Sequence, residues 1–179
     1  MVVKSDLIEQ LSRKRGLADG RRADEQIESR PDPIQSPAQV PKAEKFFVLP
    51  SVDYKRENIL TGGEIVTEII VPAPKPDSKG FYYKVRERLA WDHAIVAVAT
   101  IVESSGGAVR DARVVMGGVA PIPWRAGKAE EFLRGKAINE ANAKRAGEIA
   151  LEGAKSLKDN SYKIRIAQDL IQRGLLASV

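Results

Sequence analysis

Alternating and continuous apolar stretches predict β-strands between residues 64 and 102. The segment 64–71 (EIVTEIIV) is rich in β-branched residues and lies between Gly62-Gly63 and Pro72, which is typical of a strand bounded by turns. In 81–88 aromatic and aliphatic residues alternate with polar ones, as expected for a strand with one buried face. The segment 95–102 (IVAVATIV) is apolar on both faces, and this pattern predicts a central strand.

A further strand is predicted at 109–116, joined to 95–102 by a hairpin. The connecting residues are Ser104-Ser105-Gly106-Gly107. Two consecutive glycines readily adopt the positive φ angles that a tight antiparallel turn needs. We therefore expect these two strands to be antiparallel neighbours.

After Pro121 and Pro123 the pattern becomes helical. We expect one helix over 126–134, ended by Gly135, and a second from the N-cap Asn139 to about Lys155. The second helix carries a stripe of small residues, Ala143, Ala146, Ala150 and Ala154. A third helix begins at about Tyr162, and its apolar face consists of Ile164, Ala167, Leu170, Ile171 and Leu175. Strands followed by helices predict an α+β fold, a three- to four-stranded antiparallel sheet with three helices on one face.

Residues 1–45 have a different composition from the rest. They contain no aromatic residue, and four prolines fall between positions 31 and 41. We expect a flexible N-terminal arm and proline-rich linker over 1–45, and a folded domain over 46–179. Leu7, Ile8 and Leu11 recur at helical spacing after Ser5, which fits either a short docking helix or a frayed arm.

The charge pattern argues against nucleic acid as a partner. The chain of 179 residues has a formal net charge of +5, but nine basic and eight acidic residues share positions 1–45, so the excess is spread over the chain. No aromatic residue interleaves the basic runs for base stacking. We expect no binding to nucleic acid.

Composition also excludes several kinds of site and location. Without cysteine the chain has no disulfide, thiolate nucleophile or iron-sulfur ligand, and its single histidine, His93, rules out a multi-histidine metal site. The longest apolar run, 95–102, is less than half of the roughly 20 residues that a membrane-spanning helix needs. The N-terminus has no secretory h-region. We expect no metal, no membrane and a cytoplasmic location.

Few residues carry chemistry on their own. The pairs Gly62-Gly63 and Gly117-Gly118 do not lead directly into a helix, so we interpret them as turn or bulge glycines and not as phosphate loops. His93, beside Trp91 and Asp92, is interpreted as structural. Trp124-Arg125 fits either a stacking surface for a planar ligand or an indole packed against the sheet.

Several segments in order resemble one known family. They are FFVLPSVD (46–53), RENILTGGEIVTEI (56–69), YYKVRERLAWDHAIVAVA (82–99), VRDARVVMGGVAPIPWRA (109–126), AEEFLRGK (129–136) and DNSYKIRIAQDLIQRGLL (159–176). Over about three quarters of its length the chain resembles the medium, FAD-binding subunit of xanthine dehydrogenase and CO dehydrogenase-type molybdenum hydroxylases. The resemblance is to the small C-terminal α+β domain of that subunit, so it implies the sheet and three helices predicted above.

The resemblance implies FAD as cofactor and two residues near it. Val66 and Lys84 match family positions that approach the flavin, and a lysine there holds positive charge that favours the reduced, anionic flavin. Lys84 fits equally well as an exposed lysine on the polar face of a strand. The larger FAD-binding domain of the family, with its glycine-rich loops, has no counterpart in 1–45. We therefore expect the chain alone to bind FAD weakly or not at all, and to have no activity alone.

The family relationship also implies partners. They are a separate FAD domain, a molybdopterin-binding large subunit and an iron-sulfur small subunit. Two hypotheses follow from the sequence. The chain is either a truncated component of a flavin subunit that contributes a wall of the flavin pocket and subunit contacts, or a non-catalytic interaction or remnant domain without a cofactor.

Overall fold

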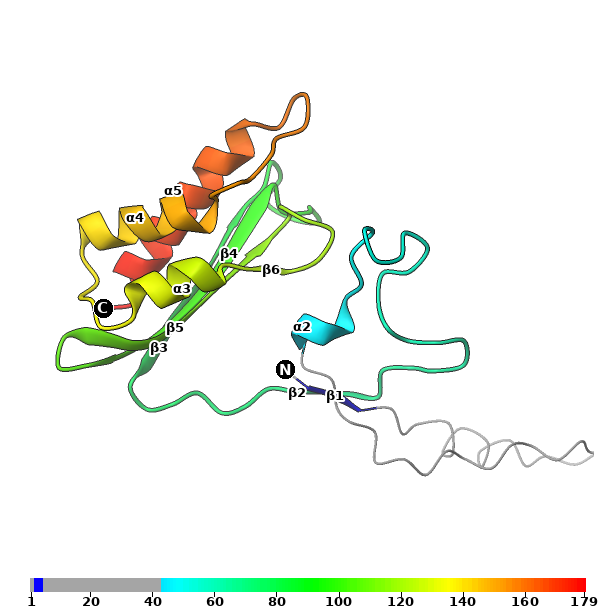
Figure 1. Ribbon diagram of the computed structural model, residues 1–179, viewed down its shortest axis with the longest axis horizontal. Helices are drawn as coiled ribbons and strands as arrows, with labels where there is room; N and C mark the ends of the chain where they lie inside the picture. Colours follow the sequence, from blue (N-terminus) through cyan, green and yellow to red (C-terminus); the bar gives the residue numbers. More distant parts are fainter. Residues whose placement is uncertain (1, 5–42) are drawn as a thin grey trace, which may run out of the picture. The chain divides into compact units, whose positions relative to one another are not determined.

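The computed structural model describes residues 2–4 and 43–179, which form two compact units (Figure 1). The described part of the first unit contains residues 2–4, 43–48 and 55–72, and the second contains 49–54 and 73–179. Most of the predicted arm, 1–45, and the whole of the predicted helix around 7–11 lie outside the described residues. The start of the domain at residue 46 stays a prediction.

The first unit contains little regular structure. The strands β1 (Val2–Lys4) and β2 (Glu68–Ile70) pair antiparallel, and α2 (Ala43–Phe46) is a single turn of helix. The strand predicted over 64–71 is therefore wrong in extent, because only its last part is extended and paired. Its partner β1 has three residues, and a strand pairs only along the length of its neighbour.

The second unit is built on a four-stranded antiparallel sheet. Its strands are β3 (Ser78–Val85), β4 (Val96–Ser105), β5 (Ala108–Gly117) and β6 (Trp124–Arg125), in that spatial order. The predicted strand count is confirmed, but the fourth member is β6 and not the segment 64–71. A two-residue strand carries no alternation in its sequence, so the pattern could not indicate it.

The hairpin between β4 and β5 confirms the prediction from its glycines. Ser105 pairs with Ala108, which leaves Gly106 and Gly107 as a two-residue turn. Their φ angles are 59° and 79°, the left-handed values that favour glycine. The turn sets the pairing next to it, and an irregularity between Glu103 and Ser104 shifts the register of the rest of this pair by one residue.

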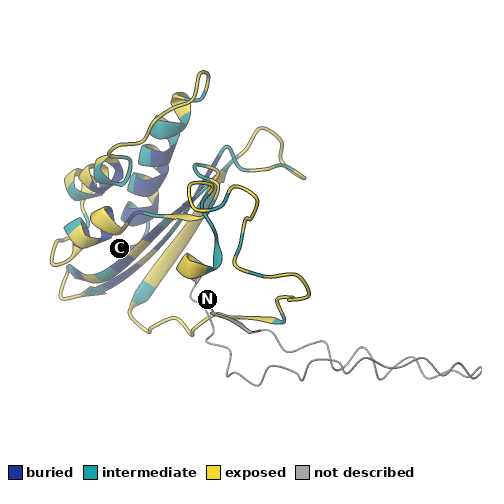
Figure 2. Cartoon of the chain, turned by 45° about the vertical axis from the view of Figure 1, so that its right-hand side comes forward, coloured by how far each residue is buried: buried dark blue, intermediate teal, exposed yellow. Residues whose placement is uncertain are grey.

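One face of the sheet is buried and the other is partly open. On β4 the residues Val96, Val98, Thr100 and Val102 are each at most 1% exposed. Their neighbours on β5, Met116, Val114 and Ala112, are equally buried, and Tyr83 and Val85 of β3 share this face. Figure 2 shows β4 and β5 as largely buried and the edge strand β3 as largely exposed.

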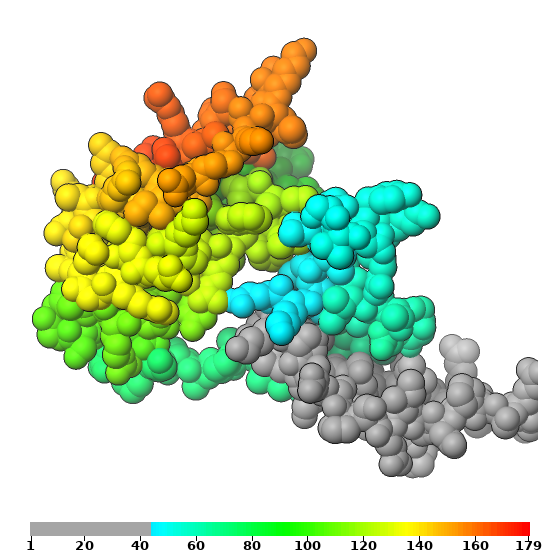
Figure 3. All heavy atoms as spheres, viewed as in Figure 1, coloured from blue at the N-terminus to red at the C-terminus, as the bar shows by residue number. Residues whose placement is uncertain are grey.

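Three helices cover the buried face, as predicted (Figure 1). They are α3 (Gly127–Leu133), α4 (Glu140–Ala150) and α5 (Tyr162–Leu176). Helix α5 packs on β4 and β3, α3 packs on β5, and α4 packs against α3 and α5. In the space-filling view the helix atoms form a continuous layer over this part of the unit (Figure 3). The α+β fold is confirmed.

The helix ends follow local sequence signals with one exception. Asn139 is the N-cap of α4, and its side-chain oxygen accepts a hydrogen bond from the Asn142 N–H at 2.8 Å. Gly135, with φ at 73°, follows the end of α3. However, α4 ends at Ala150 and not near Lys155, because the chain turns there and Gly153 adopts a φ of 78°. Ala154 therefore lies outside the helix.

Candidate functional site

Lys84 lies on the sheet face that the helices leave uncovered. It pairs in register with Ala97 of β4, whereas its neighbours Tyr83 and Val85 point to the helix side. Its side chain is exposed, and Tyr82, two residues earlier on the same face, is 65% exposed. The predicted alternation of β3 is confirmed, and it gives this face a cation beside an aromatic ring.

The Lys84 ammonium is held by the loop that follows β3. Its Nζ donates a hydrogen bond to the backbone carbonyl of Asp92 at 2.7 Å. This contact joins the strand to the far end of the loop 86–94. The position of the cation therefore depends on how that loop is folded.

Asp92 organises the loop through its carboxylate. Its Oδ2 accepts hydrogen bonds from the backbone N–H groups of Arg88 at 2.9 Å and Glu87 at 3.1 Å. The Arg88 backbone N–H lowers the pKa of Asp92 most, the Glu87 and His93 N–H groups and the Lys84 charge lower it further, and desolvation opposes them. A carboxylate that accepts several backbone donors is held in its charged form.

The tip of the loop presents apolar side chains to solvent. Leu89 is 89% exposed and Trp91 is 96% exposed. Trp91 also has a φ of 52°, the one positive value among the described residues other than glycine. The Arg88 guanidinium donates to the Trp91 carbonyl at 2.9 Å and so holds this unfavourable backbone conformation. The loop is thus an ordered projection with an exposed indole.

Val66 lies in the first unit, between Gly63 and β2. It is 40% exposed and is not part of a strand, so its predicted place within a strand is wrong. Nearby, the Thr61 N–H donates to Glu64 at 2.7 Å, and this bond lowers the pKa of Glu64. Val66 and Lys84 belong to separate units. Their roles as flavin contacts stay predictions.

Arg125 and Trp124 do not form a single binding surface. The Arg125 guanidinium pairs with Glu130 through Nε at 3.0 Å and through one terminal nitrogen at 2.8 Å. Glu130 is 2% exposed, and its other oxygen accepts a hydrogen bond from the Val114 N–H at 2.9 Å. This buried pair joins β6 and α3 to β5. Trp124 pairs with Met116 in the sheet and is 44% exposed, so its indole is only partly packed against the sheet.

The remaining candidates have structural surroundings. Gly118 has a φ of 75°, and a Cβ there would lie 2.9 Å from the Ala94 carbonyl oxygen, so it is a turn glycine at a close approach. Among residues 2–4 and 43–179, no group of three His, Asp or Glu side chains is arranged to hold a metal ion. In the same ranges no helix is long and apolar enough to cross a membrane.

Sequence reasoning did not identify Asp92 as the residue that organises the loop. In the sequence Asp92 stands out only as a neighbour of His93. An aspartate four residues after Arg88 is compatible with side-chain bonds to preceding backbone N–H groups, which is the signal that could have indicated its role. Without the loop conformation that signal is weak.

Comparison with known proteins relates this geometry to flavin-binding subunits. Residues 81–178 match the model of the CO dehydrogenase flavoprotein C-terminal domain. The aldehyde oxidoreductase FAD-binding subunit PaoB of Escherichia coli (strain K12) is 30% identical over 123 residues, which is 69% of this chain and 35% of PaoB. The carbon monoxide dehydrogenase medium chain of Hydrogenophaga pseudoflava is also 30% identical, over 67% of this chain and 43% of the relative.

Solved structures agree with the sequence comparisons. A carbon monoxide dehydrogenase from Hydrogenophaga pseudoflava superposes with a TM-score of 0.63 at 30% identity, over 68% of this chain and 43% of the other. Quinoline 2-oxidoreductase from Pseudomonas putida 86 gives 0.61 at 28% identity, with the same coverage. The chain therefore spans less than half the length of the relatives it matches.

Proposed function

Since the chain belongs to the CO dehydrogenase flavoprotein C-terminal domain family, we propose that its second unit forms one wall of the flavin site of a molybdenum hydroxylase-type oxidoreductase. The observation that carries this proposal is the position of Lys84. The residue lies on the uncovered sheet face, next to an ordered loop that holds its ammonium group.

The uncovered face suits one side of a flavin ring. Tyr82 offers an exposed aromatic side chain, and the exposed Gly80 and the small, partly exposed Ala99 lie beside it on this face. When bound, FAD supplies the storage of electrons. The contribution of this chain is positional and electrostatic, because Lys84 places a fixed positive charge at the wall.

The described residues fit only part of an FAD site. In 43–179 no glycine-rich turn leads directly into a helix N-terminus, which is the usual cradle for a pyrophosphate. The nucleotide part of FAD therefore has to be bound by a segment outside the described residues or by another polypeptide. We extend the proposal to the partners accordingly, a FAD-binding domain together with molybdopterin-binding and iron-sulfur subunits.

The experiment uses a chimeric subunit. The part of PaoB outside the matched region is joined to residues 43–179 of this chain, with unchanged PaoB as the reference for folding and flavin content. We expect the chimera to retain FAD, seen as flavin absorbance that co-elutes with the protein. A folded chimera without flavin, when PaoB retains it, would instead support a non-catalytic interaction domain.

Two lysines on opposite faces of β3 test the role of Lys84. Lys84→Gln removes the charge on the uncovered face, and Lys79→Gln removes one from the same strand on the helix side, opposite Val102. We expect Lys84→Gln to lower the two-electron reduction potential of the bound flavin by roughly 30 mV, the equivalent of a tenfold change in equilibrium constant. We expect Lys79→Gln to leave it unchanged. Equal effects of the two substitutions would refute the assigned role.

A further inference from the structure

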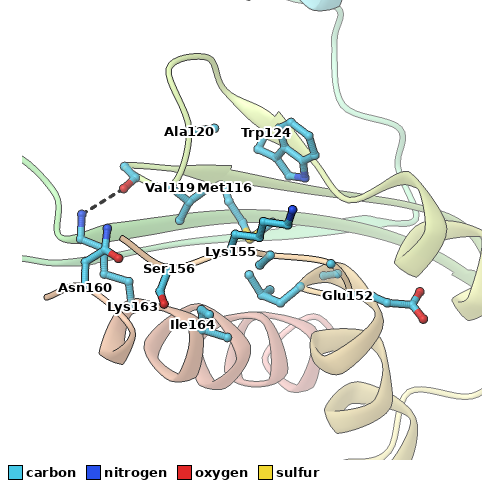
Figure 4. Close-up of a pocket in the computed structure, with 15 residues that line it drawn as sticks. Met116, Val119, Ala120, Trp124, Glu152, Lys155, Ser156, Asn160, Lys163 and Ile164 are labelled. Atoms are coloured by element: carbon cyan, nitrogen blue, oxygen red, sulfur yellow. Dashed lines mark hydrogen bonds between the residues drawn. The ribbon is translucent and has the colours of Figure 1, made fainter. Parts of the chain in front are cut away.

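A second candidate site lies within the second unit, at a cavity of about 270 Å³ (Figure 4). It opens between the β5–β6 connection, which contributes Val119, and the α4–α5 connection, which contributes Lys155. Lys84 and the loop 86–94 do not line it. The cavity is thus separate from the proposed flavin wall and does not depend on it.

The inner surface of the cavity is mostly apolar. Met116 of β5, Val119 and Ile164 of α5 form part of it, and the partly exposed indole of Trp124 forms another wall. A volume slightly below the range of roughly 300 to 1,000 Å³ for drug-sized ligands suits a molecule of one or two rings. Such a ring gains from burial against these side chains and from an aromatic contact with Trp124.

Two of the polar side chains that line the cavity are cationic. Lys155 and Lys163 both line it, and Figure 4 shows Lys155 extending in the direction of Trp124. Within the described residues, 2–4 and 43–179, Lys155 has no hydrogen-bond or ion-pair partner. Lys163 donates one hydrogen bond, to the Gly118 carbonyl at 3.2 Å, and an ammonium group has three N–H donors.

The one carboxylate among the lining residues does not neutralise these lysines. Glu152 is paired with Lys128, with 3.6 Å between Nζ and the carboxylate oxygen. In Figure 4 its carboxylate points away from the cavity. The cavity therefore has an apolar interior and positive charge that the Glu152 carboxylate does not neutralise.

From this combination we infer that the cavity binds a small aromatic carboxylate. The ring occupies the apolar interior beside Trp124, and the carboxylate accepts a charge-assisted hydrogen bond from Lys155, whose side chain extends to that end of the cavity (Figure 4). Lys163 lies at the opposite end, where it adds positive charge without contacting the carboxylate. A neutral ring of the same size gains only the apolar contacts. A free phosphate or other purely polar anion leaves the apolar walls uncovered, so it is a poor match.

The test uses the full chain, labelled with ¹⁵N, and 2-naphthoate as the probe. The two tryptophans give two indole N–H signals, which Trp91→Phe assigns. We expect 2-naphthoate to shift the Trp124 signal in a saturable manner while the signal of the exposed Trp91 stays constant. Neutral 2-naphthamide should bind more weakly by about fivefold to tenfold, the value of a partly exposed charge-assisted bond.

Matched variants separate charge from shape. Lys155→Gln should weaken the affinity for 2-naphthoate by the same factor and leave the affinity for 2-naphthamide unchanged. Lys158→Gln, on the same connection but outside the cavity, should change neither affinity. Ala150→Leu, at the end of α4, fills part of the cavity without altering charge and should weaken both ligands. Circular dichroism checks that each variant is folded.

Three results would overturn the inference. The first is the absence of a saturable shift of the Trp124 signal in the unsubstituted chain. The second is equal affinity for 2-naphthoate and 2-naphthamide. The third is an equal response of Lys155→Gln and Lys158→Gln. None of these results bears on flavin retention by the chimeric subunit, so the two proposals fail independently.

Discussion

At the scale of single residues, two carboxylates hold separate parts of the second unit together. Asp92 ties the loop 86–94 together at the uncovered sheet face, and Glu130 ties β6 and α3 to β5 beneath the helices. Both accept hydrogen bonds from backbone N–H groups. Their surroundings differ, since Asp92 is partly exposed and Glu130 is buried, so their loss has different consequences.

Replacement of Asp92 should loosen the loop without unfolding the domain. In Asp92→Ala the N–H groups of Glu87 and Arg88 lose their acceptor, and we expect their hydrogen exchange to accelerate by roughly threefold to tenfold. Amides in the centre of β4 should exchange as before. Asp159→Ala, in the connection before α5, is the control. Unchanged exchange at Glu87 and Arg88 would mean that the carboxylate does not organise the loop.

The same contacts make the loop sensitive to acid. The pKa of Asp92 is lowered below its usual value of 3.8, chiefly by the Arg88 N–H, whereas the unfolded chain keeps the usual value. The stabilisation is therefore fully present above that usual value and is lost as the pH falls through the lower, folded pKa. A carboxyl titration followed by NMR should give a midpoint for Asp92 below 3.8. A midpoint at or above this value would contradict the account.

Loss of Glu130 should instead destabilise the whole unit. Glu130→Ala leaves the Val114 N–H and the partly buried Arg125 guanidinium without this acceptor, and we expect about 2 to 4 kcal/mol less free energy of unfolding. The neighbouring Glu131→Ala changes an exposed side chain and should cost below about 0.5 kcal/mol. Urea unfolding monitored by circular dichroism measures both. Similar values for the two variants would show that the buried pair is unimportant.

At the scale of elements, glycines set how closely the helices approach their neighbours. A Cβ at Gly147 in α4 would lie 2.9 Å from the Gln168 carbonyl oxygen of α5. At Gly174 in α5 it would lie 2.8 Å from Cγ2 of Thr100 on β4. Such distances leave no room for a methyl group, so these two glycines set the spacing between α4 and α5 and between α5 and β4.

Gly→Ala substitutions at different helical positions should therefore change the stability of the domain in opposite directions. In an unconstrained helix Gly→Ala stabilises by about 0.5 to 1 kcal/mol. We expect Gly147→Ala to destabilise by about 1 to 3 kcal/mol, because the backbone of α5 has to move. Gly127→Ala, at the start of α3, meets nothing within 4 Å and should be neutral or stabilising. Thermal unfolding distinguishes them, and stabilisation by Gly147→Ala would contradict the packing described.

The elements also show where the sequence was informative. The strands β3, β4 and β5 were predicted because their alternation or continuous apolarity reflects burial against the helices. The segment 64–71 is also rich in β-branched residues, but only residues 68–70 pair, with β1, and all three are exposed. Composition alone therefore gave the wrong extent. Strand β6 was not predicted because Trp124 and Arg125 are fixed by tertiary contacts, among them the bond to Glu130.

In the candidate site, too, the sequence indicated individual residues but not the contacts between them. Lys84 was indicated by the resemblance, and its face of β3 was indicated by the alternation. The bond from Lys84 to the Asp92 carbonyl, the positive φ of Trp91 and the cavity beside Trp124 depend on contacts between residues that are distant in sequence or on loop geometry. No periodic pattern encodes such contacts.

At the scale of the whole molecule, the second unit combines a closed α+β core with the sheet face that we propose as one wall of a flavin site. The core of the second unit is closed by three helices and contains no buried side-chain polar atom without a partner among the described residues. The uncovered sheet face carries Lys84, but the described residues offer no cradle for a pyrophosphate. The central claim is that flavin binding requires a complementary FAD-binding segment.

The most direct measurement of this claim is a calorimetric titration of FAD into two samples. The first is the 179-residue chain alone, and the second is the chimeric subunit freed of its flavin. The account predicts no saturable heat with the chain alone and stoichiometric binding with the chimera. Tight, one-to-one uptake of FAD by the chain alone would contradict it.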